Sequence, residues 1–306
     1  MIHTAVLKNE VLEYLDPKEN ENFVDCTIGE GEHTELILQK NGPNGKVLGI
    51  DLDPQQIESS RWLEAHFKDR ITLVNDSYAN LQEIIRIKNF PCLPPACPVG
   101  RAGRNQVNGI LLDLGMSSAQ LEGTEKGFTF KQDQGLDMRY NDQSGHLTAE
   151  KIINEWPQER IENILKEYGE EKFSKKIAKN ITEHRKKGRI KTTFQLIEII
   201  KEAVPPSYSK QKIHYATRTF QALRIAVNDE LENIKKVLPQ ALSVLSPGGR
   251  LVAISFHSLE DRIVKNFLKK AKGLKILTKK PVAASPGEIN TNPRARSAKL
   301  RAAIKI

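Results

Sequence analysis

Residues 22–34 read NFVDCTIGEGEHT, and this stretch decides the fold. Residues 22–27 are typical of a short apolar strand, and Gly29 and Gly31 follow in a loop that leads into a helix expected at 34–39. Glycine in such a loop lets the backbone approach a ligand closely and adopt positive φ. A strand that passes through a glycine loop into a helix indicates the first unit of a doubly wound α/β sheet.

The same alternation continues along the chain. Further strands are expected at 45–51, 70–74, 107–114, 248–256, 274–277 and 298–304, with a helix at 54–67. Only helical patterns occur in the middle, at 149–154, 157–168, 171–186 and 193–203, and a long helix broken near Asn228 is expected over 210–238. We therefore predict an α/β domain over 1–139 and 214–306 that carries an all-helical insertion over 140–213.

Positive charge is concentrated in two segments of a chain whose formal net charge is +9. Residues 166–212 hold 13 Lys/Arg against 6 Asp/Glu, and residues 262–306 hold 13 against 1. Segregated positive charge favours a polyanion partner such as nucleic acid, with a solvated lysine-rich surface as the alternative.

The cysteine count and the hydropathy pattern bear on the compartment. Three cysteines (Cys26, Cys92 and Cys97) do not suit a disulfide scaffold and fit a reducing cytoplasm. Cys92 and Cys97 lie in a proline-rich loop where nothing completes a ligand set, so no metal site is predicted. Because no apolar run approaches a membrane span and no leader pattern is found, we expect a cytoplasmic protein without a membrane partner.

Asp51 is the first candidate for ligand binding. It ends the expected second strand about 20 residues after the glycine loop, where a carboxylate can accept hydrogen bonds from a ribose diol. Both NAD and S-adenosylmethionine carry such a diol. A third glycine at the required spacing is missing, and Glu32 would repel a pyrophosphate, which favours the cationic sulfonium cofactor. A tight turn that binds no ligand is the alternative.

Asp113 is the second candidate, because it ends the expected fourth strand at the edge where doubly wound sheets bind ligands. Its alternative role is to cap a following helix. Phe220 and Arg224 share a helix face and could hold a base and its phosphate, although Phe220 alone reads as core. His257 is more typical of a hydrogen-bonding residue than of a base. The basic strip 292–301 is either a phosphate contact or a solvated face.

Several motifs together resemble the RsmH/MraW family, which methylates N4 of a cytidine in the decoding region of small-subunit ribosomal RNA. The motifs are TIGEGEHT (27–34), Asp113 to Ser118 with Gln120, LDMR (136–139), YGEE (168–171), TRTFQALRI (217–225), ISFHSLEDRIVK (254–265) and NPRARSAKLR (292–301). The resemblance runs from His3 to the last strand and keeps the order of the motifs.

The resemblance implies a Rossmann-like class I methyltransferase with a helical insertion that recognises RNA. It implies small-subunit ribosomal RNA, within the 30S particle, as the partner, and a homodimer is a further expectation. It also implies S-adenosylmethionine contacts, which are carried over to Gly31, Glu32, His33, Asp51, Tyr78, Asp113 and Gln120. The chain departs from the usual pattern at three positions, with Glu32 for Gly, Tyr78 for Phe and Tyr215 for Pro.

Methyl transfer to an amino group needs an acceptor for the N4 proton, because the N4 lone pair is conjugated into the ring. We expect Asp113, or a backbone carbonyl just after it, to be that acceptor. The Asp/Asn-Pro-Pro-aromatic motif of many amino-methyltransferases is absent, which counts against a DNA amino-methyltransferase. Two other classes stay open from the residues alone: an NAD-dependent oxidoreductase and a non-catalytic RNA-binding or ribosome-assembly protein.

Overall fold

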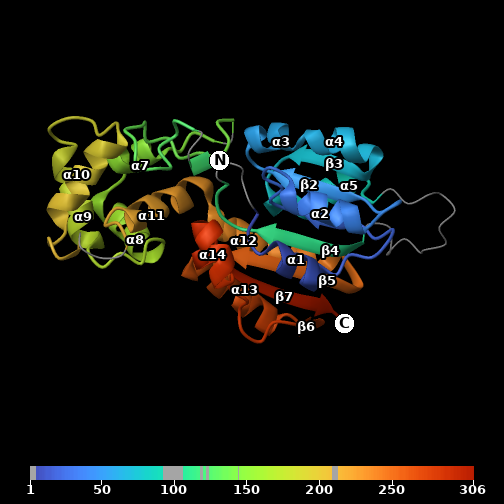
Figure 1. Ribbon diagram of the computed structural model, residues 1–306. Coiled ribbons are helices and arrows are strands. Elements are labelled where there is room, and N and C mark those ends of the chain that lie inside the picture. Colours follow the sequence, from blue (N-terminus) through green and yellow to red (C-terminus); the bar gives the residue numbers. More distant parts are fainter. Residues whose placement is uncertain (1–4, 92–105, 118–119, 122–123, 144, 209–212) are drawn as a thin grey trace. The chain divides into compact units, whose positions relative to one another are not determined.

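The chain forms two compact units in the computed structural model, which describes residues 5–91, 106–117, 120–121, 124–143, 145–208 and 213–306 (Figure 1). Residues 1–115 and 231–306 make the first, here called the sheet unit, and residues 116–230 make the second, the helical unit. Cys92 and Cys97 lie outside the described residues. Among the helices in the described ranges, none has the length and apolarity that crossing a membrane requires.

The sheet unit is built on seven strands in the order β3-β2-β1-β4-β5-β7-β6. Their bounds are β1 Phe23–Asp25, β2 Val47–Asp51, β3 Ile71–Asn75, β4 Val107–Asp113, β5 Leu245–Ser255, β6 Leu274–Ile276 and β7 Lys299–Lys305. The five strands from β3 to β5 are parallel, whereas β7 lies antiparallel between β5 and β6. This order is that of a doubly wound α/β sheet, and the predicted fold class is confirmed.

Helices connect and cover these strands. They are α1 Lys8–Leu15, α2 Glu32–Lys40, α3 Pro54–Ser60, α4 Trp62–Phe67, α5 Leu81–Ile87, α12 Glu230–Val244, α13 Ser258–Lys270 and α14 Pro286–Thr291, with short 3-10 turns η1 Lys68–Arg70, η2 Tyr78–Asn80 and η5 Pro293–Ser297. Helix α1 packs on β4 and β5, and α3 packs on β2 and β3. Apolar side chains such as Phe23, Ile37 and Leu111 are fully buried between these layers, which fixes the strand ends in place.

The register of the parallel strands brings three carboxylates to one edge of the sheet. Asp25, the last residue of β1, pairs with Gly49 of β2 and with Leu111 of β4. Asp51 and Asp113 therefore each lie two residues beyond the end of β1, on either side of it. The strand order reverses at β1 and β4, so this edge is the switch point at which such sheets bind ligands.

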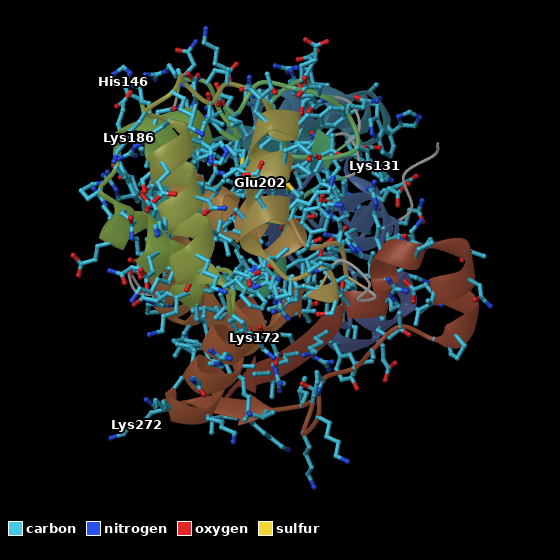
Figure 2. The ribbon with its side chains drawn as sticks, turned by 90° about the vertical axis from the view of Figure 1, so that its left-hand side faces the viewer. Lys131, His146, Lys172, Lys186, Glu202 and Lys272 are labelled. Atoms are coloured by element: carbon cyan, nitrogen blue, oxygen red, sulfur yellow. The ribbon has the colours of Figure 1, made fainter. Side chains whose placement is uncertain are left out.

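The helical unit has its own apolar core, and Figure 2 labels some of its charged side chains, among them Lys131, Lys172 and Glu202. Its helices are α7 Ala149–Glu155, α8 Gln158–Glu167, α9 Ser174–His184, α10 Thr193–Ala203 and α11 Thr217–Asn228. The unit is larger than residues 140–213, because Leu136, Met138 and Phe220 are buried in the same core. The boundaries predicted at 139/140 and 213/214 thus fall inside the helical unit, and α11 begins at Thr217 where a start near residue 210 was expected.

Two residues predicted as a base-holding pair are engaged within the helical unit. Phe220 is buried in its core, with 4% of its surface exposed. The Arg224 guanidinium donates from Nε and Nη2 to the two carboxylate oxygens of Glu230, at 2.8 and 2.9 Å. The two parallel hydrogen bonds to a buried carboxylate hold the guanidinium at the end of α11. Because the guanidinium is engaged in this way, the geometry does not favour the predicted role in holding a phosphate.

Candidate active site

The glycine loop joins β1 to α2 through two residues in the left-handed region. Gly29 has φ 53° and Gly31 has φ 91°. A Cβ at Gly31 would lie 2.7 Å from Cδ1 of Leu63, so a side chain is disfavoured there by both conformation and space. The loop therefore presents backbone, not side chains, at the start of α2, as the sequence predicted.

Asp51 is bonded directly to this loop. Its Oδ2 accepts a hydrogen bond from the Gly29 N–H at 3.1 Å, and its Oδ1 accepts from the Asp53 N–H at 2.9 Å. Burial raises the pKa of Asp51 to about 7, against the opposing effect of these two hydrogen bonds. The two backbone donors fix the orientation of the carboxylate and leave each oxygen with a further lone pair for a ligand hydroxyl.

Asp25 lies beneath the loop, and the sequence reasoning missed it. Its side chain is buried, with Oδ2 accepting from Thr34 Oγ1 at 2.8 Å and Oδ1 accepting from the Thr27 N–H at 3.1 Å. Burial raises the pKa of Asp25, and the bonds to Thr34 and Thr27 act against that rise. The sequence signal for this contact was an acid, Asp25, at the end of an apolar strand and two residues before Thr27.

Asp113 and His33 meet at the same edge. His33 Nε2 lies 3.6 Å from Asp113 Oδ2, and the Asp113 N–H donates to Thr27 Oγ1 at 2.7 Å. Burial lowers the pKa of His33, but the Asp113 contact and the negative charges of Asp113, Asp25 and Glu32 outweigh it, and the net pKa is raised. Within the described residues, Asp113 Oδ1 and both His33 ring nitrogens are buried without a hydrogen-bond partner. Unsatisfied buried polar atoms at a strand end suit a polar ligand.

Glu32 points its side chain to the N-terminal segment. One carboxylate oxygen, Oε2, accepts from the Ala5 N–H and lies 3.1 Å from Lys8 Nζ. The Glu32 side chain, which stands where the resembling family usually has glycine, is thus engaged with residues 5–8. The backbone of Glu32 is the part that a ligand at the glycine loop would meet.

Two further residues of the predicted site belong to other elements. Tyr78 opens η2 just after β3 and is half-buried. Gln120 belongs to the helical unit, where its Oε1 accepts from the Ser117 N–H at 3.0 Å. The structure thus joins the glycine loop, His33, Asp51 and Asp113 by direct contacts within the sheet unit.

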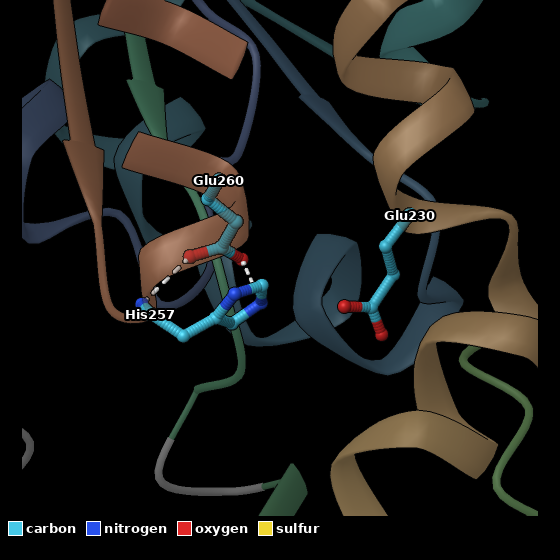
Figure 3. A group of neighbouring side chains, drawn as sticks. All are labelled: Glu230, His257 and Glu260. Atoms are coloured by element: carbon cyan, nitrogen blue, oxygen red, sulfur yellow. Dashed lines mark hydrogen bonds and ion pairs between the residues drawn. The ribbon is translucent and has the colours of Figure 1, made fainter. Parts of the chain in front are cut away.

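The histidine motif after β5 is a helix cap (Figure 3). Glu260 Oε2 accepts from the Phe256 N–H at 2.8 Å and from the His257 N–H at 3.2 Å, and Glu260 Oε1 lies 3.1 Å from His257 Nε2. The figure also draws Glu230, the partner of Arg224 in the helical unit. His257 is therefore engaged with its own helix start through its backbone N–H and the Glu260 contact, while both ring nitrogens are buried without a hydrogen-bond partner among the described residues.

Part of the basic strip near the C-terminus is structural as well. Arg301 of β7 is 8% exposed and donates to both oxygens of Asp261, at 2.6 and 3.2 Å. This ion pair connects β7 to α13. Because its guanidinium is bonded to Asp261, Arg301 is not a good candidate for a phosphate contact. Most lysines of the longer basic segment 262–306, such as Lys269, Lys275 and Lys280, are exposed.

Comparison with known proteins gives a match over the whole chain. Residues 1–306 match the family described as the MraW methylase family. A Heliobacterium modesticaldum protein named ribosomal RNA small subunit methyltransferase H is 44% identical over 322 residues, covering 99% of this chain and 98% of that protein. A protein of the same name from Sulfurihydrogenibium sp. (strain YO3AOP1) is 46% identical over 307 residues, covering 99% of both. A solved rRNA methylase from Streptococcus thermophilus aligns with TM-score 0.44 and 11% identity, covering 100% of this chain and 99% of that chain.

Proposed function

Because the chain belongs to the MraW methylase family over its full length, we propose that it methylates N4 of a cytidine in small-subunit ribosomal RNA, with S-adenosylmethionine as methyl donor. The relatives at 44% and 46% identity carry a name that states methylation of small-subunit ribosomal RNA. The N4 position comes from the resemblance of the motifs. The observation that carries the proposal is the pair of carboxylates, Asp51 and Asp113, that flank the glycine loop at the switch point of the sheet.

The residues at this edge fit the cofactor. The glycine loop offers backbone groups for the methionine part, and Asp51 offers a carboxylate already oriented by Gly29 and Asp53 for the ribose hydroxyls. Three acids, Asp25, Asp51 and Asp113, gather where a cation would bind, which suits a sulfonium and would repel a pyrophosphate. Tyr78 is proposed to stack on the adenine, and Gln120 and the backbone of Glu32 complete the proposed set.

S-adenosylmethionine supplies a methyl group that is already activated, so the protein's task is chiefly to position N4 and to remove its proton. Transfer to N4 would break the carbon–sulfur bond of the donor, leave that electron pair on the sulfur and make N4 positive, so N4 must lose a proton. We assign its acceptance to the Asp113 carboxylate, whose Oδ1 has no protein donor among the described residues. His33 Nε2 lies 3.6 Å from Asp113 Oδ2, and its raised pKa would place a positive charge beside the proposed acceptor when His33 is protonated.

RNA recognition is proposed for the helical unit and for the basic C-terminal segment. Residues 166–212 and 262–306 together carry 26 Lys/Arg against 7 Asp/Glu, and phosphate contacts from such residues give RNA affinity that falls with salt. The expected cytoplasmic location, the 30S particle as the form of the substrate and a homodimer stay predictions that go with this proposal.

Mass mapping of methylated nucleosides tests the function. Purified protein is incubated with S-adenosylmethionine and small-subunit RNA, naked or in assembled particles, and the digested RNA is analysed for N4-methylcytidine. We expect one cytidine to gain a methyl group at N4. A methyl group on carbon 5, on a ribose or on DNA alone would refute the assignment of the target atom.

Asp113→Asn tests the assigned acceptor, because the amide keeps the shape and loses the negative charge. We expect methyl transfer to fall by about 10²- to 10⁴-fold, with the S-adenosylmethionine Kd changed far less. The control is Asp69→Asn, which alters an exposed carboxylate of η1 in the same unit. Unchanged turnover in Asp113→Asn would remove Asp113 from the mechanism.

A further inference from the structure

Three aromatic rings of the helical unit form a stack at its surface. The His214 imidazole stacks on Phe130 with ring centroids 4.6 Å apart and on Tyr215 with centroids 4.2 Å apart, at interplanar angles of 14° and 29°. His214 is exposed, whereas Phe130 and Tyr215 are half-buried. Ile213, next to the stack in sequence, is 54% exposed. We call Phe130, His214 and Tyr215 the ring stack.

The ring stack is held rigidly from below. The Ala216 N–H donates to His214 Nδ1 at 3.3 Å, just before α11 begins, and this fixes the orientation of the imidazole. Phe130 contacts the buried ring of Phe220 edge-on, with centroids 5.5 Å apart. Partial desolvation lowers the pKa of His214, so the imidazole stacked against Phe130 and Tyr215 carries no charge near pH 7. A preoriented ring loses little conformational freedom when a ligand stacks on it.

The charge around the ring stack favours an anionic partner. Lys131 follows Phe130 directly, is exposed and is labelled in Figure 2. The Tyr215 phenol lies near Glu198 and Lys201 of α10, which are paired with each other at 3.2 Å and so contribute little net charge. The helical unit also contains the segment 166–212, with its 13 Lys/Arg against 6 Asp/Glu. Protein–protein interfaces are depleted in lysine, so the lysines of this unit favour an anionic partner over a protein partner.

We propose that the ring stack is a platform on which an unpaired base of the substrate RNA stacks. RNA-binding proteins hold unstacked bases on Phe, Tyr and His faces while Lys and Arg contact the backbone, and the ring stack with Lys131 offers this combination. The proposal rests on the proposed function for the nature of the partner. It adds residues outside the sheet unit, one of which, Tyr215, stands where the resembling family usually has proline.

Binding of a fluorescent single-stranded RNA oligonucleotide, followed by anisotropy, tests the proposal. We expect Tyr215→Ala to raise the RNA Kd by about 5- to 150-fold, the range measured for loss of one base–aromatic stack, and Tyr215→Phe to stay near wild type because the ring is kept. Trp156→Ala is the matched control: Trp156 is a half-buried aromatic of the same unit whose face is covered by Arg160, 3.5 Å from its centroid. Melting temperatures identify variants that fail to fold.

Oligonucleotides that lack one base at a time test the same contact from the RNA side, with the wild-type protein. At one position the abasic RNA should bind wild type more weakly, and the same RNA should bind Tyr215→Ala no more weakly than the intact RNA does. Equal Kd values for wild type and Tyr215→Ala, or no abasic effect at any position, would overturn the ring-stack proposal and point to a protein partner or a purely structural role.

Methyl incorporation separates this inference from the proposed function. If the wild type methylates RNA while its RNA Kd is insensitive to Tyr215→Ala, only the ring-stack proposal fails. If RNA binding depends on Tyr215 but no methyl group is transferred to RNA, the ring-stack proposal stands and the proposed function fails.

Discussion

Replacement of Asp51 by Asn should stabilise the sheet unit while it damages the site. A pKa of about 7 in the folded protein, against 3.8 for an ordinary aspartate, means that burial opposes the ionised form. Each pKa unit corresponds to about 1.36 kcal/mol, so the full cost of the ionised Asp51 reaches at most about 4 kcal/mol. The side chain is only half-buried and Asn loses one of the two backbone hydrogen bonds, which reduces the net gain to about 1–3 kcal/mol.

The sign of the pH dependence follows from the raised pKa. Below pH 3.8 the carboxyl is neutral in both the folded and the unfolded chain, and no cost arises. As the pH rises towards 7, the unfolded chain ionises while the folded chain resists, so wild type loses stability that Asp51→Asn keeps. The advantage of the variant should therefore grow between about pH 4 and about pH 7 and stay constant above that.

Urea unfolding of the sheet unit provides the measurement. The chain has two tryptophans, Trp62 in the sheet unit and Trp156 in the helical unit, so a Trp156→Phe background makes the fluorescence report on the sheet unit alone. Trp62 is well placed, since its Nε1–H donates to the Glu30 carbonyl of the glycine loop at 3.1 Å. Asp69→Asn serves as the exposed control and should show no such trend. A stability difference that is independent of pH, or that shrinks as pH rises, would refute the reasoning.

Three other outcomes follow from the same site. The affinity for S-adenosylmethionine, measured by calorimetry, should rise by about tenfold per pH unit up to about pH 7 and then level off, because the ribose hydroxyls donate to the ionised Asp51 carboxylate. This pH dependence should vanish in Asp51→Asn. A flat profile for the wild type would contradict the prediction. Gly31→Ala should lower the unfolding free energy by about 1–3 kcal/mol and weaken cofactor binding, because φ 91° and the Leu63 contact both oppose a Cβ; a wild-type melting curve would argue against this. The raised pKa of His33 should add stability below pH 6.5, and this stability disappears as the pH rises through the pKa of His33 in the folded protein. His33→Gln should therefore lower the unfolding free energy most in acid. A loss of unfolding free energy that increases towards alkaline pH would contradict this prediction.

Much of the sheet and its edge could be predicted from the sequence because the information is local. An apolar strand, a glycine loop and a carboxylate about 20 residues later are enough to place Asp51 beside the loop, and the Gly29–Asp51 hydrogen bond confirms that neighbourhood. Asp113 was found for the same reason, since the carboxyl ends of parallel strands share one edge. The roles assigned to both residues stay predictions.

The features that the sequence reasoning missed depend on contacts distant in sequence. The engagement of Glu32 with Ala5 and Lys8 joins positions about 25 residues apart, and no periodicity marks it. Asp25 looked like part of an apolar strand, and only burial with Thr34 gives it a structural task. The antiparallel insertion of β7 between β5 and β6 likewise depends on strand pairing and not on strand propensity.

The compact helical unit extends beyond the predicted insertion for a related reason. Residues 116–139 have no helical or strand period, so pattern reading assigned them to the preceding α/β domain. Their apolar side chains, among them Phe128, Leu136 and Met138, are buried with the helices that follow. Segments without regular structure are assigned to a unit by what they pack against, and a sequence pattern does not contain that information.

A crystal structure with S-adenosylhomocysteine and cytidine bound would test the central claim most directly. The account predicts ribose hydroxyls on the Asp51 carboxylate, the amino-acid portion against the backbone of the glycine loop, and cytidine N4 within hydrogen-bonding distance of Asp113. A nucleoside seated elsewhere on the molecule, or an N4 atom that faces away from Asp113, would contradict it.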